Sequence, residues 1–292
     1  MGRMDGKVAL ITGAARGQGR SHAVTLAREG ADILAIDCPP QFGTVPYELA
    51  TAEELAETVA EVEALDRRII AVEGDVREQG PLDSLVEQGI AELGKIDVCV
   101  ANAGLANLGS FWEMSDDEWT TVIDTNLSGV WRTAKAVTPH MIEREAGSIV
   151  LISSVSGVEG APGLSNYVAA KHGVLGLMKC ICLELGPKYG IRCNAILPGP
   201  IATKIIDWPG MRDFMAGGEG LGEDIDLNES CKAWGAMKDV GLLDPQDTSN
   251  AVLFLASDDS RYVNGLEMLV DAGHRMLPGL NMEAIAAATA PA

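Results

Sequence analysis

Two side chains one helical turn apart form the strongest chemical feature of the sequence. Tyr167 and Lys171 lie four residues apart in the helical stretch "SNYVAAKHG", so they share one face. A neighbouring ammonium group favours the phenolate form of tyrosine. Lowering its ordinary pKa of ~10 by about 3 units corresponds to roughly 4 kcal/mol. The pair could therefore take the proton from an alcohol while a hydride leaves, and return it in the reverse reaction.

Two polar residues earlier in the chain could complete this site. Ser154 ends a predicted strand, at the sheet edge where ligands bind, and could hold and orient the substrate oxygen. Asn126, in "DTNLSG", is predicted to lie inside a helix that opens at Ser115. Alone, a Tyr-x-x-x-Lys pair fits an ordinary surface pair equally well. The ordered combination of these residues with a nucleotide-binding loop is harder to explain without catalysis.

That loop is the glycine-rich stretch "TGAARGQG", Thr12 to Gly19. It follows the first predicted strand and opens the first predicted helix, which is the context that a pyrophosphate-binding turn requires. The glycines permit a tight turn and close backbone approach, and the helix start offers free N–H groups. The predicted cofactor-binding residues of the loop are Gly13, Arg16, Gly17, Gln18 and Gly19.

The next strand end carries the residue that should select the cofactor. Asp37 can accept hydrogen bonds from both hydroxyls of an adenosine ribose and would repel a 2′-phosphate, which favours NAD over NADP. Arg16 argues for NADP, but a carboxylate pressed against a phosphate is the costlier clash. Asp75 and Val76 follow the third strand, where Asp75 either contacts the adenine or merely caps a turn.

Short, wholly apolar runs alternate with helical stretches along the chain, as expected for strands buried on both faces. The predicted strands are 7–12, 31–37, 68–75, 95–104, 147–154, 190–199 and 265–271. The predicted helices cover 17–29, a segment from Thr51, 81–94, a segment from Ser115, 165–185 and 245–256. This alternation predicts one Rossmann-like domain over 1–292, an α/β fold with a doubly wound parallel sheet of about seven strands. Residues 38–51 form an insertion loop, 200–244 a substrate lid and 283–292 a loose tail.

Composition excludes several classes of partner. The net charge of −20 argues against nucleic acid and anionic membranes, which require a basic face. No apolar run is long enough to span a bilayer, and the N-terminus does not resemble a signal peptide. The six cysteines lack zinc spacing and the histidines have no ligand partners, so we expect no metal, reduced thiols and a cytoplasmic protein.

Taken together, these motifs resemble the short-chain dehydrogenase/reductase family over nearly the whole chain. The matching pieces are "TGAARGQG", "ANAG" (the family usually begins it with Asn), "TNLSG", "ISS", "YVAAK" and "PGPIAT". The resemblance implies that Ser154, Tyr167 and Lys171 are catalytic, that Lys171 also binds the nicotinamide ribose, and that Asn126 holds a water in a proton relay. It further implies cofactor contacts from Asn102, Ala103, Gly104, Tyr167, Pro198, Gly199, Ile201 and Thr203.

The N-terminal stretch and the "TVPYELAT" loop resemble the carveol-dehydrogenase-like branch, which is also described as mycofactocin-associated. Members of this branch are regarded as holding NAD tightly and returning electrons through that peptide-derived carrier. We therefore expect Phe42, Val45, Pro46 and Tyr47 to cover bound NAD. A plain surface insertion or a subunit contact would explain the loop equally well.

The predicted substrate side is apolar. It draws on Ile201, Ile205, Ile206, Trp208, Met211, Phe214, Met215, Trp234 and Met237, and on Leu105, Leu108, Phe111, Trp112, Val155 and Val158. We expect an apolar secondary alcohol or ketone, and the resemblance suggests a cyclic terpenoid such as carveol. The alternatives are an NADPH-dependent ketone reductase and a nucleotide-binding scaffold without turnover. The family resemblance also implies a homotetramer.

Overall fold

Seven parallel strands form one sheet in the computed structural model, which describes residues 2–277. Their order across the sheet is β3-β2-β1-β4-β5-β6-β7. The strands are β1 (Val8–Thr12), β2 (Asp32–Asp37), β3 (Ile69–Glu73), β4 (Val98–Ala101), β5 (Ser148–Ile152), β6 (Arg192–Pro198) and β7 (Glu267–Val270). The order reverses between β1 and β4, and ligands of open α/β sheets bind at such a switch point.

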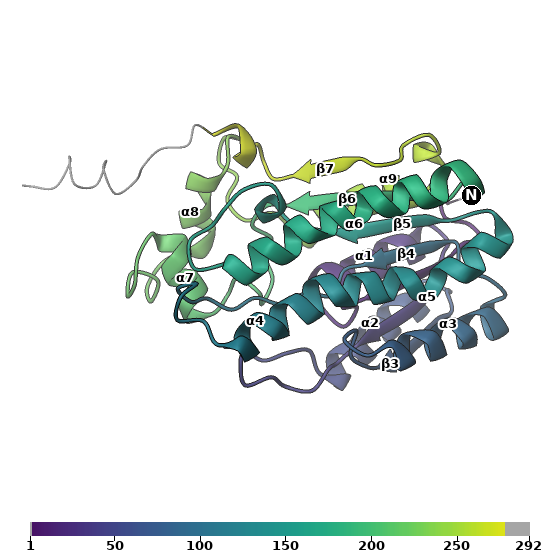
Figure 1. Cartoon of the computed structure of the whole chain (residues 1–292), viewed down its shortest axis with the longest axis horizontal. Helices are drawn as coiled ribbons and strands as arrows, with labels where there is room; N and C mark the ends of the chain where they lie inside the picture. The colour runs from purple at the N-terminus through teal and green to yellow at the C-terminus, as the bar shows by residue number, and fades with distance from the viewer. Residues whose placement is uncertain (1, 278–292) are drawn as a thin grey trace, which may run out of the picture.

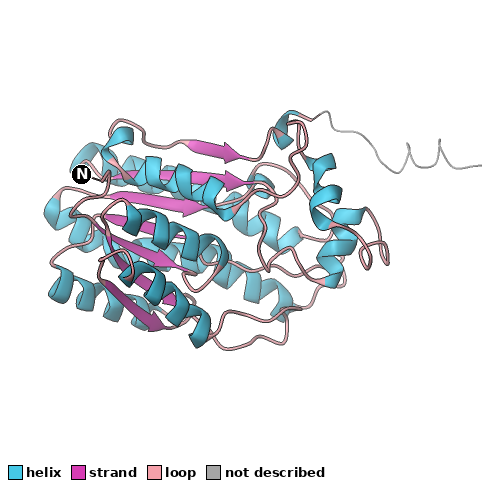
Figure 2. Cartoon of the chain, turned by 180° about the vertical axis from the view of Figure 1, so that it is seen from behind, coloured by secondary structure: helices cyan, strands magenta, loops and turns pink. Residues whose placement is uncertain are grey.

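Helices cover both faces of this sheet (Figure 1). They are α1 (Gly17–Arg28), α2 (Ala52–Glu63), α3 (Gln79–Leu93), α4 (Asp116–Ile123), α5 (Gly129–Arg144), α6 (Ser165–Tyr189), α7 (Pro209–Ala216), α8 (Leu227–Cys231) and α9 (Pro245–Ala256). α3, α4, α5 and α6 lie on the face turned to the viewer in Figure 1. α1, α2 and α9 cover the other face, which Figure 2 shows. The predicted doubly wound fold is therefore confirmed.

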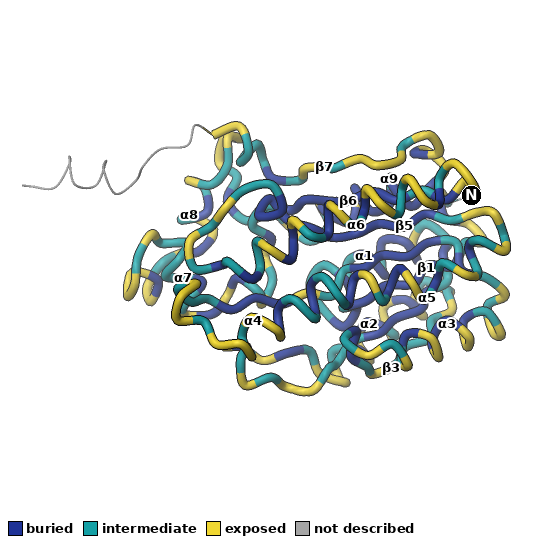
Figure 3. Tube along the Cα trace, viewed as in Figure 1, coloured by how far each residue is buried: buried dark blue, intermediate teal, exposed yellow. Residues whose placement is uncertain are grey.

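All strand arrows point toward the end of the molecule where α7 and α8 lie (Figures 1 and 2). The carboxyl ends of β1, β2, β4, β5 and β6, which carry the predicted site residues, consequently meet at one edge. The central strands are buried on both faces (Figure 3), because most of their residues are apolar. The outer strands β3 and β7 are only half-buried.

Local sequence fixes where several helices begin. Thr51 and Ser115 form the predicted capping boxes with Glu54 and Glu118 at the starts of α2 and α4. Asp244 forms a third at the start of α9, which the sequence interpretation missed because Asp247 stands in place of the usual Glu or Gln.

Several predicted boundaries were wrong. The strand expected over 95–104 is only Val98–Ala101, because the chain leaves the sheet at "NAG" to form a loop at the edge. The helix expected to end near 185 continues through Pro187 to Tyr189. The 200–244 segment contains α7, α8 and a short 3-10 turn, Lys232–Trp234, and the expected tail 283–292 lies outside the described residues.

A buried histidine joins the first and last helices of the rear layer. His22 of α1 has no exposed surface, and its Nδ1 lies 2.8 Å from the Ser249 hydroxyl of α9. Burial lowers the pKa of His22 from its ordinary value of 6.5 to about 3. Between these values the unfolded chain binds a proton that the folded chain does not, so stability is lost as the pH falls below 6.5.

Because of His22, we expect the free energy of unfolding to be roughly 2 kcal/mol lower at pH 5 than above pH 6.5. The loss is ~1.36 kcal/mol for each pH unit below 6.5. His22→Asn keeps a polar atom near Ser249 but cannot titrate. Urea unfolding of both proteins at pH 7 and pH 5 measures the difference. Equal acid sensitivity in the two proteins would contradict the prediction.

Candidate active site

A cavity of about 950 Å³ occupies the carboxyl edge of the sheet. It is bordered by the phosphate loop, by the loops that follow β2, β4, β5 and β6, and by the segment that contains α7 and α8. Every residue predicted to bind the cofactor lines it: Gly13, Arg16, Gly17, Gln18, Gly19, Asp37, Asp75, Val76, Asn102, Ala103, Gly104, Tyr167, Lys171, Pro198, Gly199, Ile201 and Thr203. The topology therefore brings together residues that are widely separated in the sequence.

The phosphate loop has the shape that a pyrophosphate requires. Gly13 and Gly17 adopt positive φ angles of 68° and 55°, which L-residues with a side chain rarely adopt. A Cβ atom on Gly19 would lie 1.8 Å from the Gly13 carbonyl oxygen. The loop then opens α1 at Gly17, with its N-terminal N–H groups at the cavity. These residues fit a dinucleotide.

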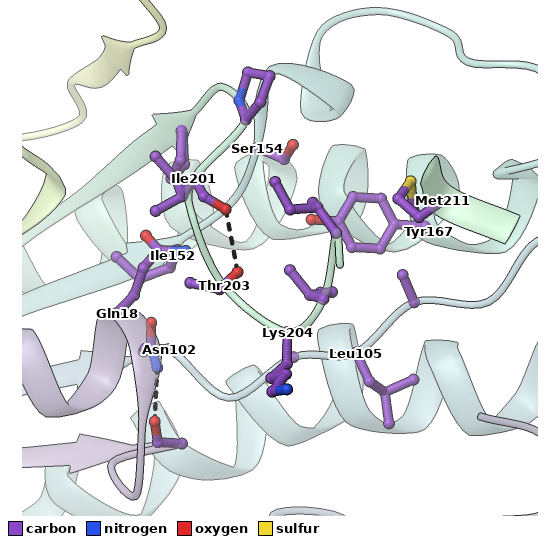
Figure 4. Close-up of a pocket in the computed structure, with 18 of the residues that line it drawn as sticks. Gln18, Asn102, Leu105, Ile152, Ser154, Tyr167, Ile201, Thr203, Lys204 and Met211 are labelled. Carbon is purple, nitrogen blue, oxygen red and sulfur yellow. Dashed lines mark hydrogen bonds between the residues drawn. The ribbon is translucent and has the colours of Figure 1, made fainter. Parts of the chain in front are cut away.

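Asn102 ties this loop to the neighbouring strand. Its side-chain amide donates to the carbonyl oxygens of Thr12, at 2.9 Å, and Gly13, at 3.2 Å. Figure 4 shows Asn102 and Gln18 at one end of the cavity. The side-chain oxygen of Gln18 is buried without a protein hydrogen-bond partner, and Gln18 lines the cavity, so a ligand polar group could satisfy it.

Asp37 is held rigidly at the end of β2. One carboxylate oxygen accepts a hydrogen bond from the Ala15 N–H at 2.8 Å and the other from the Cys38 N–H at 2.7 Å. Burial raises the pKa of Asp37, and these two backbone donors oppose the shift. The carboxylate therefore stands beside the phosphate loop, where the ribose-reading role was predicted.

The structure shows one of the two roles that were considered for Asp75. Its carboxylate accepts from the Arg77 backbone N–H at 2.8 Å and from the Arg77 guanidinium, also at 2.8 Å. Asp75 thus caps the turn after β3, as the structural alternative supposed. Both Asp75 and Val76 line the cavity, and an adenine contact there stays a prediction.

The three predicted catalytic side chains converge on the cavity from β5 and α6. Ser154 follows β5, and its hydroxyl oxygen accepts from the Ser156 N–H at 3.1 Å, which leaves the hydroxyl proton to donate. Tyr167 lies in the first turn of α6, and Figure 4 shows it beside Ser154. The Lys171 ammonium nitrogen is 5.5 Å from the centre of the Tyr167 ring.

The pKa values of Tyr167 and Lys171 are shifted differently from what the sequence led us to expect. Burial raises the pKa of Tyr167, and the protein group that opposes this is the Ser154 hydroxyl rather than Lys171. Burial also lowers the pKa of Lys171 from 10.5 to about 8, and its ammonium group donates to the Ile152 carbonyl at 2.9 Å. The expected lowering by Lys171 is thus not seen, because the ammonium group points to the strand end instead of the phenol oxygen.

Asn126 lies inside the helical run that opens after Ser115, as predicted, but at a local change of its hydrogen-bond pattern. It belongs to a π-helical turn, Asp124–Ser128, between α4 and α5, and it is fully buried. Its side-chain oxygen accepts from the Leu105 N–H at 2.9 Å, and its amide donates to the Leu105 carbonyl at 2.8 Å. The side chain therefore fixes the loop after β4. Single π-turns often occur at functional sites, but a proton relay through Asn126 stays a prediction.

The substrate side of the cavity is apolar, as expected. Its lining includes Leu164, Ile205, Ile206, Met211, Phe214, Met215 and Leu227. Six predicted members do not line the cavity. Phe111 and Trp112 are each 72% exposed and Met237 is 59% exposed, whereas Leu108, Val158 and Trp208 pack in or against apolar clusters. Phe111 and Trp112 lie in a turn after Gly109, where the chain points outward, and hydrophobicity alone could not reveal that direction.

An ionic cluster at the rim of this apolar region was missed. Glu159 accepts from the His274 ring nitrogen Nε2 at 2.7 Å and pairs with Arg275 at 3.2 Å. His274 also stacks on Trp234, at 5.5 Å between ring centres. The cluster joins the loop after β5, the 200–244 segment and the chain after β7. No spacing signal could find it, since Glu159 lies more than one hundred residues from His274 and Arg275.

The 38–51 loop contacts both halves of the cavity. Near the adenine side, Phe42 lies under the Arg77 guanidinium, 3.9 Å from its ring centre. Near the substrate side, the Tyr47 hydroxyl accepts from the Ala106 N–H at 3.0 Å, and its ring stacks with Trp208 at 6.0 Å. Thr44 also bonds to Thr121 of α4, beside which the loop runs in Figure 1. The loop is therefore packed into the site along its length.

The remaining structural questions concern metal-binding clusters, membrane-spanning helices and disulfides. Within residues 2–277, no group of three or more His, Cys, Asp or Glu side chains is arranged to hold a metal ion. None of the helices in this range combines the length and apolar character needed to cross a membrane. The six cysteines are free thiols.

Known proteins share both the sequence and the architecture. (-)-trans-Carveol dehydrogenase of Rhodococcus erythropolis is 43% identical over 277 residues, covering 94% of this chain and 99% of that protein. The crystal structure of carveol dehydrogenase from Mycobacterium avium in complex with NAD has a TM-score of 0.90 and 46% identity, covering 95% of this chain and all of that one.

A short chain dehydrogenase from Mycobacterium paratuberculosis bound to NAD has a TM-score of 0.82 and 38% identity, covering 94% and 100% of the two chains. The family model for short chain dehydrogenases matches residues 7–208. This match covers the phosphate loop, the catalytic strand and helix, and the chain after β6. The protein is therefore a member of the short-chain dehydrogenase/reductase family of oxidoreductases.

Proposed function

We propose that the protein is an NAD-dependent dehydrogenase of apolar secondary alcohols, acting reversibly on the corresponding ketones. One observation carries this proposal: Ser154, Tyr167 and Lys171 meet at one wall of a cavity whose other end holds the phosphate loop and Asp37. Two similar structures contain NAD. The NADPH-dependent alternative is weakened because the Arg16 guanidinium is paired with Glu54 at 3.2 Å.

In the proposed reaction the Ser154 hydroxyl donates to the substrate oxygen and fixes its position. The Tyr167 phenolate accepts the alcohol proton. A bound nicotinamide ring supplies the hydride acceptor, and its positive charge favours the phenolate. Lys171, anchored at Ile152, holds the ribose side and keeps a cation beside the ring of Tyr167. The apolar wall around Met211 and Phe214 excludes water from the reacting carbon.

We propose a cyclic terpenoid alcohol such as carveol as the substrate class, because two similar proteins are carveol dehydrogenases and the pocket is apolar. The 38–51 loop covers bound NAD and slows its release, so that mycofactocin, rather than cofactor exchange, returns the electrons. The protein works as a cytoplasmic homotetramer. The family resemblance is the support for the carrier and the tetramer, and the free thiols agree with a reducing compartment.

Removing the Tyr167 hydroxyl tests the chemistry directly. Tyr167→Phe should lower kcat for carveol oxidation by roughly a thousandfold, since general acid–base catalysis contributes about 10²–10⁴. Its affinity for NADH, measured by fluorescence titration, should change less than about twofold. Comparable kcat values for the two proteins would reject the assignment.

Replacing Lys171 should make the protein more stable but less active. Its folded-state pKa of about 8 lies below 10.5, so its charged form is disfavoured in the fold, and this penalty disappears as the pH rises from 8 to 10.5. Lys171→Met should lose at least a hundredfold in kcat but gain about 2 kcal/mol in stability at pH 7, after the lost hydrogen bond is counted.

This stability gain should nearly vanish at pH 10, because the wild-type lysine is then neutral when folded. Urea unfolding at both pH values provides the measurement. A difference between Lys171→Met and wild type that is the same at pH 7 and pH 10 is inconsistent with a buried, destabilised ammonium group.

Shortening residues 40–48 tests the covering loop. NAD should leave the purified protein at least tenfold faster, as measured by stopped-flow displacement with NADH. Phe42→Ala should show part of this effect, because Phe42 lines the cavity, whereas Phe111→Ala removes an exposed ring outside it and serves as the matched control. An unchanged release rate in the shortened protein would reject the lid.

A further inference from the structure

Arg16 poses a problem for cofactor selection. It immediately precedes the first turn of α1 and lines the same part of the cavity as Asp37. An arginine at this place could pair with the 2′-phosphate of NADP, because guanidinium groups bind phosphate oxygens strongly. A protein that discriminates against NADP must therefore keep the Arg16 guanidinium from binding the 2′-phosphate, in addition to providing Asp37.

In the structure, the Arg16 guanidinium is bound by two other groups of the protein. Nη1 lies 3.3 and 3.2 Å from the two carboxylate oxygens of Glu54, and Nη2 donates to the Glu48 carbonyl at 2.5 Å. The side chains of Arg16 and Glu54 are only 22% and 29% exposed, so solvent screens the pair incompletely. The guanidinium is thus directed toward α2 and the 38–51 loop.

Glu54 is fixed in place by its own helix. It occupies the third position of α2, where its carboxylate accepts from the Thr51 N–H at 3.0 Å and its N–H donates to the Thr51 hydroxyl. Glu54 also lines the cavity and lies close enough to Asp37 to raise the pKa of that carboxyl. Two carboxylates, those of Asp37 and Glu54, consequently border this part of the cavity beside Arg16.

The Arg16–Glu54 pair is not needed to hold α1 against α2. Arg20, one turn further along α1, pairs with Glu57 at 2.9 Å and donates to the Thr58 hydroxyl and the Glu54 carbonyl. These contacts join the two helices away from the cavity. The capping box explains where Glu54 stands, but helix packing does not explain why its carboxylate also pairs with Arg16.

We propose that Glu54 is a second determinant of the preference for NAD over NADP, acting by holding the Arg16 guanidinium away from a 2′-phosphate. This inference rests on the proposed NAD function. It also gives the 38–51 loop a part in selection, because the Glu48 carbonyl holds the other side of the same guanidinium.

The test is Glu54→Gln, in which the amide oxygen can still accept from Thr51 and keep the capping box intact. Fluorescence titrations with NADPH and NADH need no alcohol substrate. The dissociation constant for NADPH should fall about tenfold, and that for NADH should change less than about twofold. Adding Arg16→Met to Glu54→Gln should remove the NADPH gain.

Glu57→Gln is the matched control, since it deletes the same charge one helical turn away and touches Arg20 instead. If NADPH binds too weakly to wild type to be measured, both substitutions are compared on the Asp37→Ser background. An unchanged NADPH affinity in Glu54→Gln, an equal gain in Glu57→Gln, or a gain that survives Arg16→Met would each overturn the inference. Wild-type protein that binds neither dinucleotide would instead reject the proposed function and this inference with it.

Discussion

The arrangement of the site depends on the hydrogen bond between the buried ammonium group of Lys171 and the Ile152 carbonyl. Only 3% of Lys171 is exposed, and the ammonium group reaches the Ile152 carbonyl at the very end of β5. Burying a lysine is costly unless a hydrogen-bond partner lies in place. The Ser153 hydroxyl donates to the Lys171 carbonyl at 2.9 Å, which fixes α6 against the strand end and thereby sets Tyr167 opposite Ser154.

A second set of charges organises the other end of the cavity. Asp37 is oriented by two backbone N–H groups, and Arg16 is turned aside by Glu54 and the Glu48 carbonyl. The 38–51 loop links this region to the catalytic one through Tyr47, which bonds to Ala106 and stacks on Trp208. The surroundings of Asp37 and the apolar pocket thus share one structural segment.

Much of this could be predicted from the sequence, because the informative residues obey local rules. The phosphate loop sits between a strand and a helix, Asp37 ends the next strand, and Tyr167 and Lys171 share one helical face. The parallel sheet then brings these elements to one edge, which is why every predicted cofactor residue lines the cavity.

What sequence reasoning missed depends on tertiary geometry. The direction of the Lys171 ammonium group, the pairing of Glu159 with His274 and the outward turn at Phe111 follow from contacts between distant segments. Spacing does not encode such contacts. The π-helical turn at Asn126 was missed for a related reason, since it differs from the surrounding helix by a single hydrogen-bond register.

Because burial raises the pKa of Tyr167 in the protein alone, its role as the base requires that the positive charge of the bound dinucleotide make it acidic. Ultraviolet difference titration of tyrosinate in the NAD complex tests this most directly, because the chain has only four tyrosines. We predict that one tyrosine ionises well below its ordinary pKa, and that this signal is absent from Tyr167→Phe. A complex in which every tyrosine ionises at or above the ordinary value would contradict the account.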